Sequence, residues 1–299
     1  MKSPERAKAL LSVLLAALFW GTTYPTVRFG LTNLNLTPFS FLFLRFVFAL
    51  LALFPLLFVK LIRKEFFWSL AKPDILLLGI FNGLSYSLQF AGQVSTTAGI
   101  AAVMVNTYVL FTPLFSHLIF GQTIRRKKKI AVCVGFIGVV IIAMGDVLTV
   151  RTGSLNLTGT LLVLGGGLFA GLYVSYSEKV MNIKLDGKPL NPIAVFFSST
   201  VFSFIVIFLT CLFFRDLPKL RHISPASLIP IAYLGVVCTS GAFILYLIAV
   251  RKLGAVDSAV FTLLQIIISM IIAFIFLNEV PDIFMFMGAP LVFLAIFLV

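Results

Sequence analysis

Ten apolar runs, each about as long as a bilayer is thick, dominate this chain of 299 residues. A helix of about 20 apolar residues spans the hydrocarbon core of a membrane. Hydropathy predicts such spans at about residues 9–31, 37–59, 74–94, 99–120, 130–149, 158–178, 192–214, 226–250, 257–277 and 282–299. We therefore expect an all-α integral membrane protein with ten transmembrane helices and no soluble catalytic domain.

The composition agrees with this expectation. Hydrophobic residues make up 61% of the chain and charged residues 11%, whereas soluble proteins are about half apolar and about a quarter charged. The first apolar run continues to about Leu31, beyond the core of a secretory signal, and so predicts a retained helix. The three cysteines all fall inside apolar runs, which argues against a disulfide framework or a zinc site. We expect no metal, no cofactor and no catalytic residues.

Basic residues are concentrated on one side of the predicted bundle. Seventeen of the 23 fall in alternate breaks: Lys2, Arg6, Lys8, Lys60, Arg63, Lys64, Lys72, Arg125, Arg126, Lys127, Lys128, Lys129, Lys179, Lys184, Lys188, Arg251 and Lys252. The positive-inside rule then predicts cytoplasmic N- and C-termini. We expect the membrane to be the inner membrane of a prokaryotic cell. Topology accounts for most of the net charge of +13, so we expect no nucleic-acid partner. The run 125–129 is either a topology anchor or a site for anionic lipids.

The chain contains an internal repeat. A shift of 157 residues aligns segment 98–122 with segment 255–279, and each ends at a polar pair. With nearby shifts, LFWG (18–21) aligns with LFAG (168–171). The order of elements predicts two halves of five helices, 1–150 and 151–299. An odd number of spans per half makes the halves inverted, which is typical of secondary transporters.

Several motifs add a family resemblance. They are FWGTTYPTVRFGL in the first span, TPFSFLFLRFVFALLAL in the second, and a fourth span with Asn106 that ends at Gly-Gln. With these motifs the chain resembles the drug/metabolite transporter superfamily, in its EamA-like branch of ten-helix transporters. The resemblance implies that helices 1–4 and 6–9 line a central cavity, while helices 5 and 10 brace the outside. The first half departs from the pattern at Gln122, where the second half has Glu279.

The first span carries an unusual number of polar groups. Trp20 and Tyr24 share one helical stripe, with Gly21 and Pro25 beside them. Pro25 cannot donate to the carbonyl of Gly21, so we expect a kink and a freed acceptor there. Irregular backbone at membrane depth occurs where it faces protein or a water-filled cavity. We therefore expect this stripe to face a cavity.

Small residues recur along the third span. Gly79, Gly83, Ser87 and Ala91 are spaced by four and lie on one helix face. Such a stripe lets another helix backbone approach closely.

Deep polar and aromatic side chains form the candidate substrate site. They are Trp20, Tyr24, Arg45, Asn82, Tyr86, Gln89, Asn106, Tyr173, Tyr176, Tyr246 and Gln265. For each of them the alternative role is a hydrogen bond to a neighbouring helix that serves packing alone. Arg45 lies about eight residues inside the second span, too deep to reach the headgroups easily. It is either a structural anchor or a counter-charge for a carboxylate or phosphate.

These observations favour a secondary transporter that exports a small, amino-acid-like metabolite by alternating access. The alternative is a lipid transporter or scramblase, in which the polar stripe would form a groove open to lipid. A membrane enzyme is disfavoured, because two distant histidines and no carboxylate cluster offer little for acid–base or metal chemistry. The expected partners are a small-molecule substrate and membrane lipids, with the protein as a monomer or homodimer.

Overall fold

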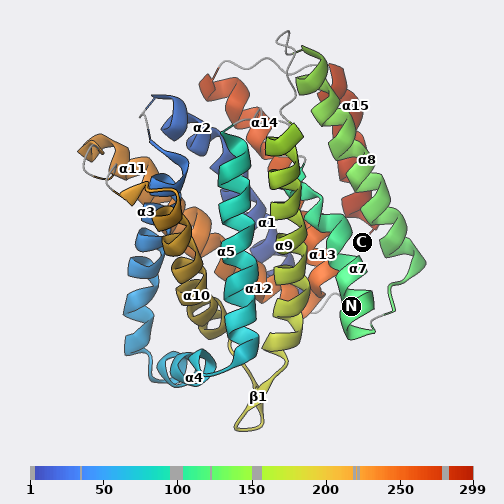
Figure 1. The fold of residues 1–299 in the computed structure, drawn as a ribbon. Helices are drawn as coiled ribbons and strands as arrows, with labels where there is room; N and C mark the ends of the chain where they lie inside the picture. Colours follow the sequence, from blue (N-terminus) through green and yellow to red (C-terminus); the bar gives the residue numbers. More distant parts are fainter. Residues whose placement is uncertain are drawn as a thin grey trace.

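The computed structural model describes residues 4–33, 36–94, 104–121, 123–149, 157–217, 220, 223–277 and 283–298, and it is a bundle of helices (Figure 1). Seven of the described helical segments are long and apolar enough to cross a membrane. Two shorter apolar helices, Met104–Phe120 and Phe286–Leu298, and the helix α8 complete the expected set of spans. Gln122 and Glu279 lie outside the described residues.

The first half runs from α1 to α8. Its elements are α1 (Pro4–Gly21), α2 (Thr23–Asn33), α3 (Pro38–Leu53), η1 (Phe54–Phe58), α4 (Lys60–Leu70), α5 (Pro73–Gln93), α7 (Tyr108–Phe120) and α8 (Arg126–Thr149). The second half runs from α9 to α15. Its elements are α9 (Leu157–Met181), β1 (Lys184–Leu185), β2 (Lys188–Pro189), α10 (Pro192–Phe213), α11 (Pro225–Tyr233), η3 (Leu234–Gly241), α12 (Ala242–Leu253), α13 (Ala255–Thr262), α14 (Leu264–Leu277) and α15 (Ile283–Leu298).

Helix packing follows the expected repeat. The first span, α1, packs on α12 and α14, and its counterpart α9 packs on α5 and α7. In the same way α3 packs on η3, and its counterpart α10 packs on α5. The fifth and tenth spans, α8 and α15, pack on each other at the edge of the bundle (Figure 1). Exchanging the two halves therefore reproduces the same set of neighbours.

Figure 1 also shows the inversion of the halves. The helix α3 descends to α4 at the lower end, whereas its counterpart α10 rises from the β1–β2 hairpin at that end. Both helices begin with a proline, Pro38 and Pro192, at the first turn, where the missing N–H costs nothing.

The third span and the seventh approach closely, as the small-residue stripe predicts. A Cβ added at Gly79 would lie 2.2 Å from the Cβ of Phe202 and 2.8 Å from the carbonyl oxygen of Ser199. No side chain fits between the α5 and α10 backbones at that point. The stripe is therefore a packing surface.

The break between the second and third spans contains a helix that hydropathy did not predict. In α4, Glu65 and Phe66 turn inward and are buried. The Glu65 carboxylate accepts a hydrogen bond from the Asn191 backbone N–H at 2.6 Å, and the Phe66 ring packs 4.4 Å from the ring of Phe197. This helix is short and amphipathic, so its average hydropathy is low. A hydropathy window set to find transmembrane spans therefore does not detect it.

Three of the expected spans are interrupted in the structure. The first breaks at Thr22, between α1 and α2, where the sequence predicts a kink. The fourth and ninth spans each have a one-residue break in the helix, at Thr107 and Leu263. At each break a threonine hydroxyl, that of Thr107 or Thr262, donates to the carbonyl oxygen three residues back. Such back-bonding bends helices. The breaks at Thr107 and Leu263 occupy equivalent places in the two halves, 156 residues apart.

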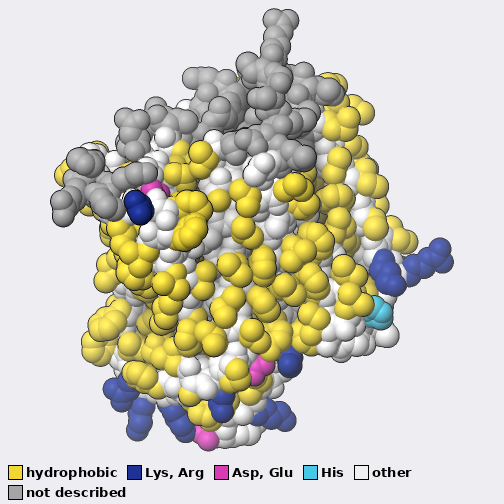
Figure 2. Space-filling model, in the orientation of Figure 1, with side chains coloured by type: hydrophobic (Ala, Val, Ile, Leu, Met, Phe, Trp, Pro, Cys, Tyr) yellow, Lys and Arg dark blue, Asp and Glu magenta, His cyan; other side chains and the backbone are white. Residues whose placement is uncertain are grey.

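The molecular surface fits a membrane protein. Figure 2 shows a broad apolar band across the middle of this face of the molecule, with Lys and Arg side chains gathered at the lower end and at the right edge. Many large apolar side chains of the described chain are exposed, for example Phe208, Ile229 and Phe276. In a bilayer this surface faces the acyl chains.

Candidate functional site

A cavity of about 100 Å³ lies at the centre of the bundle. Nine of the predicted residues line it: Trp20, Tyr24, Arg45, Asn82, Tyr86, Gln89, Tyr173, Tyr246 and Gln265. They come from both halves of the chain, on α1, α2, α3, α5, α9, α12 and α14. One water needs about 10–15 Å³ of such space. In this conformation the cavity therefore has room for several waters or a small solute.

The break at Thr22 brings the first span to the cavity. Trp20, just before it, donates from Nε1 to the carbonyl oxygen of Cys238 at 2.9 Å. The Trp20 ring packs 4.9 Å from the ring of Phe243 and 5.0 Å from that of Tyr246. The break therefore places an indole in the wall and ties it to the eighth span.

The eighth span is itself irregular at this level. Its middle segment, η3, is a π-helix, a form that is rare and often found at functional sites. The wider turn lets the Thr239 hydroxyl donate to the carbonyl oxygen of Leu234, five residues back, at 2.8 Å. A Cβ added at Gly235 would lie 2.5 Å from the carbonyl oxygen of Arg45, so the π-helix rests directly on α3. Hydropathy predicts only a continuous span here and gives no sign of the π-helix.

Arg45 is the charged residue of the cavity. Its side chain is 1% exposed, and its Nε donates to Thr239 Oγ1 at 2.8 Å. Its guanidinium carbon lies 5.0 Å from the ring centre of Tyr86, within the range of a cation–π contact. Within the described part of the chain, no carboxylate pairs with Arg45 and no acidic residue lines the cavity. The structure thus places an uncompensated positive charge at membrane depth.

Amide side chains form part of the wall. Asn82 donates to Ser203 Oγ at 3.2 Å, and Gln89 donates to Ser85 Oγ at 3.0 Å. Each is tied to a neighbour through its N–H₂ group, which holds the amide in place. Both side chains therefore contribute to packing as well as to the lining.

Two predicted residues lie elsewhere. Asn106 is fully buried and is not part of the lining, but its Oδ1 accepts a hydrogen bond of 2.9 Å from Gln265 Nε2. It therefore supports a lining residue from behind. Tyr176 lies toward the end of the bundle where α1 begins, and its hydroxyl donates to Asp74 Oδ1 at 2.5 Å.

Other lining residues were not among the predicted set. They include Thr23, Ser85, Gln93 and Tyr108. Tyr108 follows directly on the break in the fourth span and contacts Thr262 at the matching break of the ninth. A signal was present, since Ser85 and Gln89 are spaced by four and Thr23 adjoins Tyr24.

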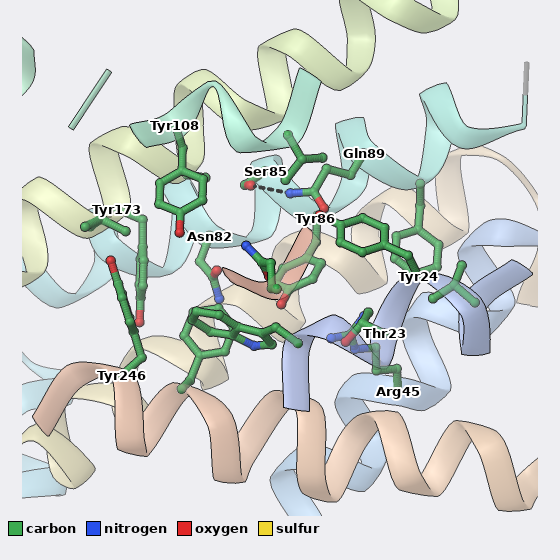
Figure 3. A pocket seen from close by; sticks show the side chains of 18 of the residues that line it. Thr23, Tyr24, Arg45, Asn82, Ser85, Tyr86, Gln89, Tyr108, Tyr173 and Tyr246 are labelled. Carbon is green, nitrogen blue, oxygen red and sulfur yellow. Dashed lines mark hydrogen bonds between the residues drawn. The ribbon is translucent and has the colours of Figure 1, made fainter. Parts of the chain in front are cut away.

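The cavity has two chemically different ends. In Figure 3, Arg45, Thr23 and Tyr24 lie at one end, and Tyr173 and Tyr246 lie at the other, with Asn82 and Tyr86 between them. The hydroxyls of Thr23 and Tyr246 are buried and have no hydrogen-bond partner among the described residues. A buried hydroxyl without a partner is costly, so these groups are ready to bond a solute or water.

Ion pairs and hydrogen bonds close the end of the bundle where α1 begins, which we call the basic end. Asp74 on α5 holds Tyr176 and also pairs with Lys179 of α9 at 3.7 Å. The Glu178 carboxylate accepts the backbone N–H of Ala255 at 3.0 Å. Two further pairs, Glu5–Lys252 at 2.8 Å and Lys128–Asp257 at 2.5 Å, join other spans at this end. Tyr176 belongs to this closure and not to the cavity.

The described residues contain no group of three or more His, Cys, Asp or Glu side chains that could hold a metal ion. The site consists instead of one guanidinium, several phenols and amides, and apolar rings. Such a set can bind and orient a small amphiphilic molecule.

Comparison with known proteins shows the same pattern in both halves. The sequence model of the EamA-like transporter family matches residues 7–144 and again residues 157–299. An uncharacterised transporter of Archaeoglobus fulgidus is 28% identical over 98% of this chain and 97% of its own length. The uncharacterised inner membrane transporter YedA of Escherichia coli is 30% identical over 53% of this chain and 50% of its own.

A solved crystal structure shares the fold. It matches with a TM-score of 0.74 and covers 98% of this chain and 96% of its own, at 15% sequence identity. The arrangement of helices is therefore one that has been observed experimentally.

Proposed function

Because the chain belongs to the EamA-like transporter family and is an integral membrane transporter, we propose that it carries a small, amino-acid-like metabolite with a carboxylate through the central cavity. The mechanism is secondary transport by alternating access, and the direction is export. The location is a prokaryotic inner membrane, with both termini in the cytoplasm. Transport is the whole activity, and no catalytic step is assigned.

The uncompensated charge of Arg45 is the observation that carries the proposal. A charged side chain near the bilayer centre costs about 2.5–3.5 kcal/mol on insertion scales. Thr239 and Tyr86, which contact its side chain, are neutral. A substrate carboxylate would supply the missing counter-charge, and a guanidinium can bind it through two parallel hydrogen bonds.

The remainder of the cavity suits the rest of such a molecule. Aromatic rings of Trp20, Phe243 and Tyr246 provide apolar contact, and the unpaired Tyr246 hydroxyl provides a hydrogen bond. The Arg45 end and the Tyr246 end are separated by Asn82 and Tyr86 (Figure 3). This order favours a solute with an anionic head and an apolar or weakly polar body.

Alternating access is supported by the repeat. The two halves are inverted and make equivalent contacts, so an exchange of conformations between them would open the cavity to the opposite side. The pairs at the basic end are the contacts that would have to part.

The lipid-transport alternative requires a polar groove that opens to the bilayer. Arg45, Asn82, Tyr173 and Tyr246 are all buried inside the described bundle. Polar groups buried inside the bundle in this way favour a small water-soluble solute over a phospholipid.

A thermal-shift screen of the purified protein tests the proposal. The panel contains neutral amino acids, organic monocarboxylates, amines without a carboxylate, and nucleotide sugars. We expect carboxylates to raise the unfolding temperature and the amines to leave it unchanged. Hits are then followed in proteoliposomes with the labelled compound on either side of the membrane, which also measures direction.

Two variants test the role of Arg45 in this screen. Arg45→Gln should abolish both the shift and the transport of the carboxylate hit, whereas Arg63→Gln, which removes an exposed charge on α4, should change neither. Equal stabilisation by amines and carboxylates, or full transport by the Arg45→Gln protein, would rule out the proposed role of the guanidinium.

A further inference from the structure

A second cavity lies at the edge of the bundle, between α7 and α8. Its volume is about 520 Å³. Leu110, Pro113 and Leu114 of α7 form one wall and Val132 of α8 contributes to the other. Two basic groups, His117 and Lys129, line its end near the loop that joins the two helices. We call this cavity the α7–α8 groove.

The packing of α8 explains why the groove is open. Two glycines of this helix face other neighbours: a Cβ added at Gly135 would meet Leu263 of the ninth span at 2.6 Å, and one at Gly138 would meet the Gly288 carbonyl of α15 at 2.7 Å. The face of α8 that allows close helix packing is therefore turned toward the ninth span and α15. Its contact with α7 is sparse by comparison with its contact with α15.

The groove opens onto the apolar surface of the molecule. Leu114 and Leu118 on α7 are exposed, as are Ile130 and Ile137 on α8. In a transmembrane bundle this surface lies against acyl chains. An apolar groove at that position is filled by hydrocarbon in the bilayer.

The end of the groove is strongly basic. Arg125, Arg126, Lys127 and Lys129 are exposed, and within the described chain none of them pairs with a carboxylate. Only Lys128 of this run has an acidic partner, Asp257. Figure 2 shows a cluster of Lys and Arg at the right edge of the molecule, at the border of the apolar band. Each such charge near a membrane surface attracts anionic lipid by about 1 kcal/mol.

From the apolar groove and its basic end together, we propose that the α7–α8 groove binds an anionic phospholipid. One acyl chain lies along Leu114 and Val132, and the headgroup phosphate lies at Lys129 and His117. The lipid fills the gap between α8 and α7, and α7 carries Tyr108 into the central cavity. The bound lipid thus braces one wall of the transport site. This inference does not depend on the identity of the transported substrate.

Native mass spectrometry of the full chain tests the proposal. The protein is delipidated in detergent and titrated with dioleoyl phosphatidylglycerol or dioleoyl phosphatidylcholine. We expect one molecule of the anionic lipid to bind with about tenfold preference over the zwitterionic one. Equal binding of the two lipids overturns the proposal.

Two variants locate the site. Lys129→Gln should weaken binding of the anionic lipid about fivefold. Leu114→Trp, which fills the groove at an exposed position, should weaken it without changing any charge. The matched control is Lys127→Gln, which removes the same charge from the same run but from a residue outside the groove lining, and it should alter binding less than twofold.

Unfolding temperatures measured without lipid confirm that the variants are folded. Equal loss in the Lys129 and Lys127 variants would mean diffuse attraction to the basic run, and unchanged binding to the Leu114→Trp protein would place the lipid elsewhere. Either result overturns the groove as the site.

Discussion

Arg45 on α3 donates a hydrogen bond of 2.8 Å from Nε to the Oγ1 of Thr239, which lies 194 residues further along the chain in the π-helix η3. The same hydroxyl donates to the carbonyl oxygen of Leu234. A π-helical turn, a threonine and a buried guanidinium therefore form one unit, and the orientation of Arg45 toward the cavity depends on it.

Removing the Thr239 hydroxyl should destabilise the protein. Thr239→Val keeps the volume but leaves a charged, buried donor without its acceptor, which costs about 1–3 kcal/mol of unfolding free energy. Thr200→Val is the matched control, because the Thr200 hydroxyl is equally buried but bonds only to the Phe196 carbonyl of its own helix. Chemical unfolding in mixed detergent micelles compares the two. Equal losses would mean that the link to Arg45 contributes nothing.

Removing two aromatic side chains from the cavity wall should strongly reduce transport without unfolding the chain. The double variant Trp20→Ala, Tyr24→Ala removes two lining side chains from the broken first span. We expect uptake into proteoliposomes to fall by about tenfold or more, which corresponds to about 1.4 kcal/mol of lost binding. The yield of folded protein, measured by size-exclusion chromatography, should be preserved. Wild-type uptake by this variant would exclude both residues from the transport path.

Removing the ion pair of Asp74 at the basic end should make the adjoining ends of α5 and α9 open more often. Asp74→Asn removes the ion pair with Lys179 and weakens the hydrogen bond from Tyr176. Amide hydrogen exchange at the adjoining ends of α5 and α9 should rise about fivefold, since 1 kcal/mol of lost closure has that effect. The control Asp186→Asn breaks an exposed pair with Lys64 in the hairpin, and exposed pairs are worth little. If both variants leave exchange at these ends unchanged, Asp74 does not hold the closure.

Adding a methyl group between α5 and α10 should be costly. Gly79→Ala places a Cβ 2.2 Å from that of Phe202, and overpacking of this kind destabilises by about 1–3 kcal/mol. Gly241→Ala is the control, because its nearest neighbour, the Val236 carbonyl oxygen, lies at 3.6 Å. Thermal unfolding monitored by tryptophan fluorescence should show a lower midpoint for the first variant only. A normal midpoint for Gly79→Ala would mean that the two helices can separate without loss.

Local properties of the chain account for most of the fold. The limits of the predicted spans agree with the helices to within a few residues wherever the chain is described, for instance 74–94 against Pro73–Gln93. The inverted repeat and the break near Gly21 and Pro25 follow from the order of motifs and from the chemistry of proline. The division between residues 150 and 151 remains a prediction.

The cavity was predicted in part. Depth within a span, which can be counted along the chain, selected nine residues that line one cavity, because polar side chains are expensive in hydrocarbon and collect inside the bundle. Depth alone does not distinguish a lining residue from one behind the wall. Asn106 therefore turned out to support Gln265, and Tyr176 to close the basic end.

The sequence by itself thus determined that the chain is a membrane bundle of two inverted halves, because hydrophobicity, span length and repeat order are properties of short segments. Only the tertiary structure decided which face of each helix meets the cavity, that the eighth span widens to a π-helix beneath Arg45, and that no acidic residue of the described chain neutralises that charge. These features depend on contacts between residues far apart in sequence, such as Arg45 and Thr239, and no local pattern encodes such a contact.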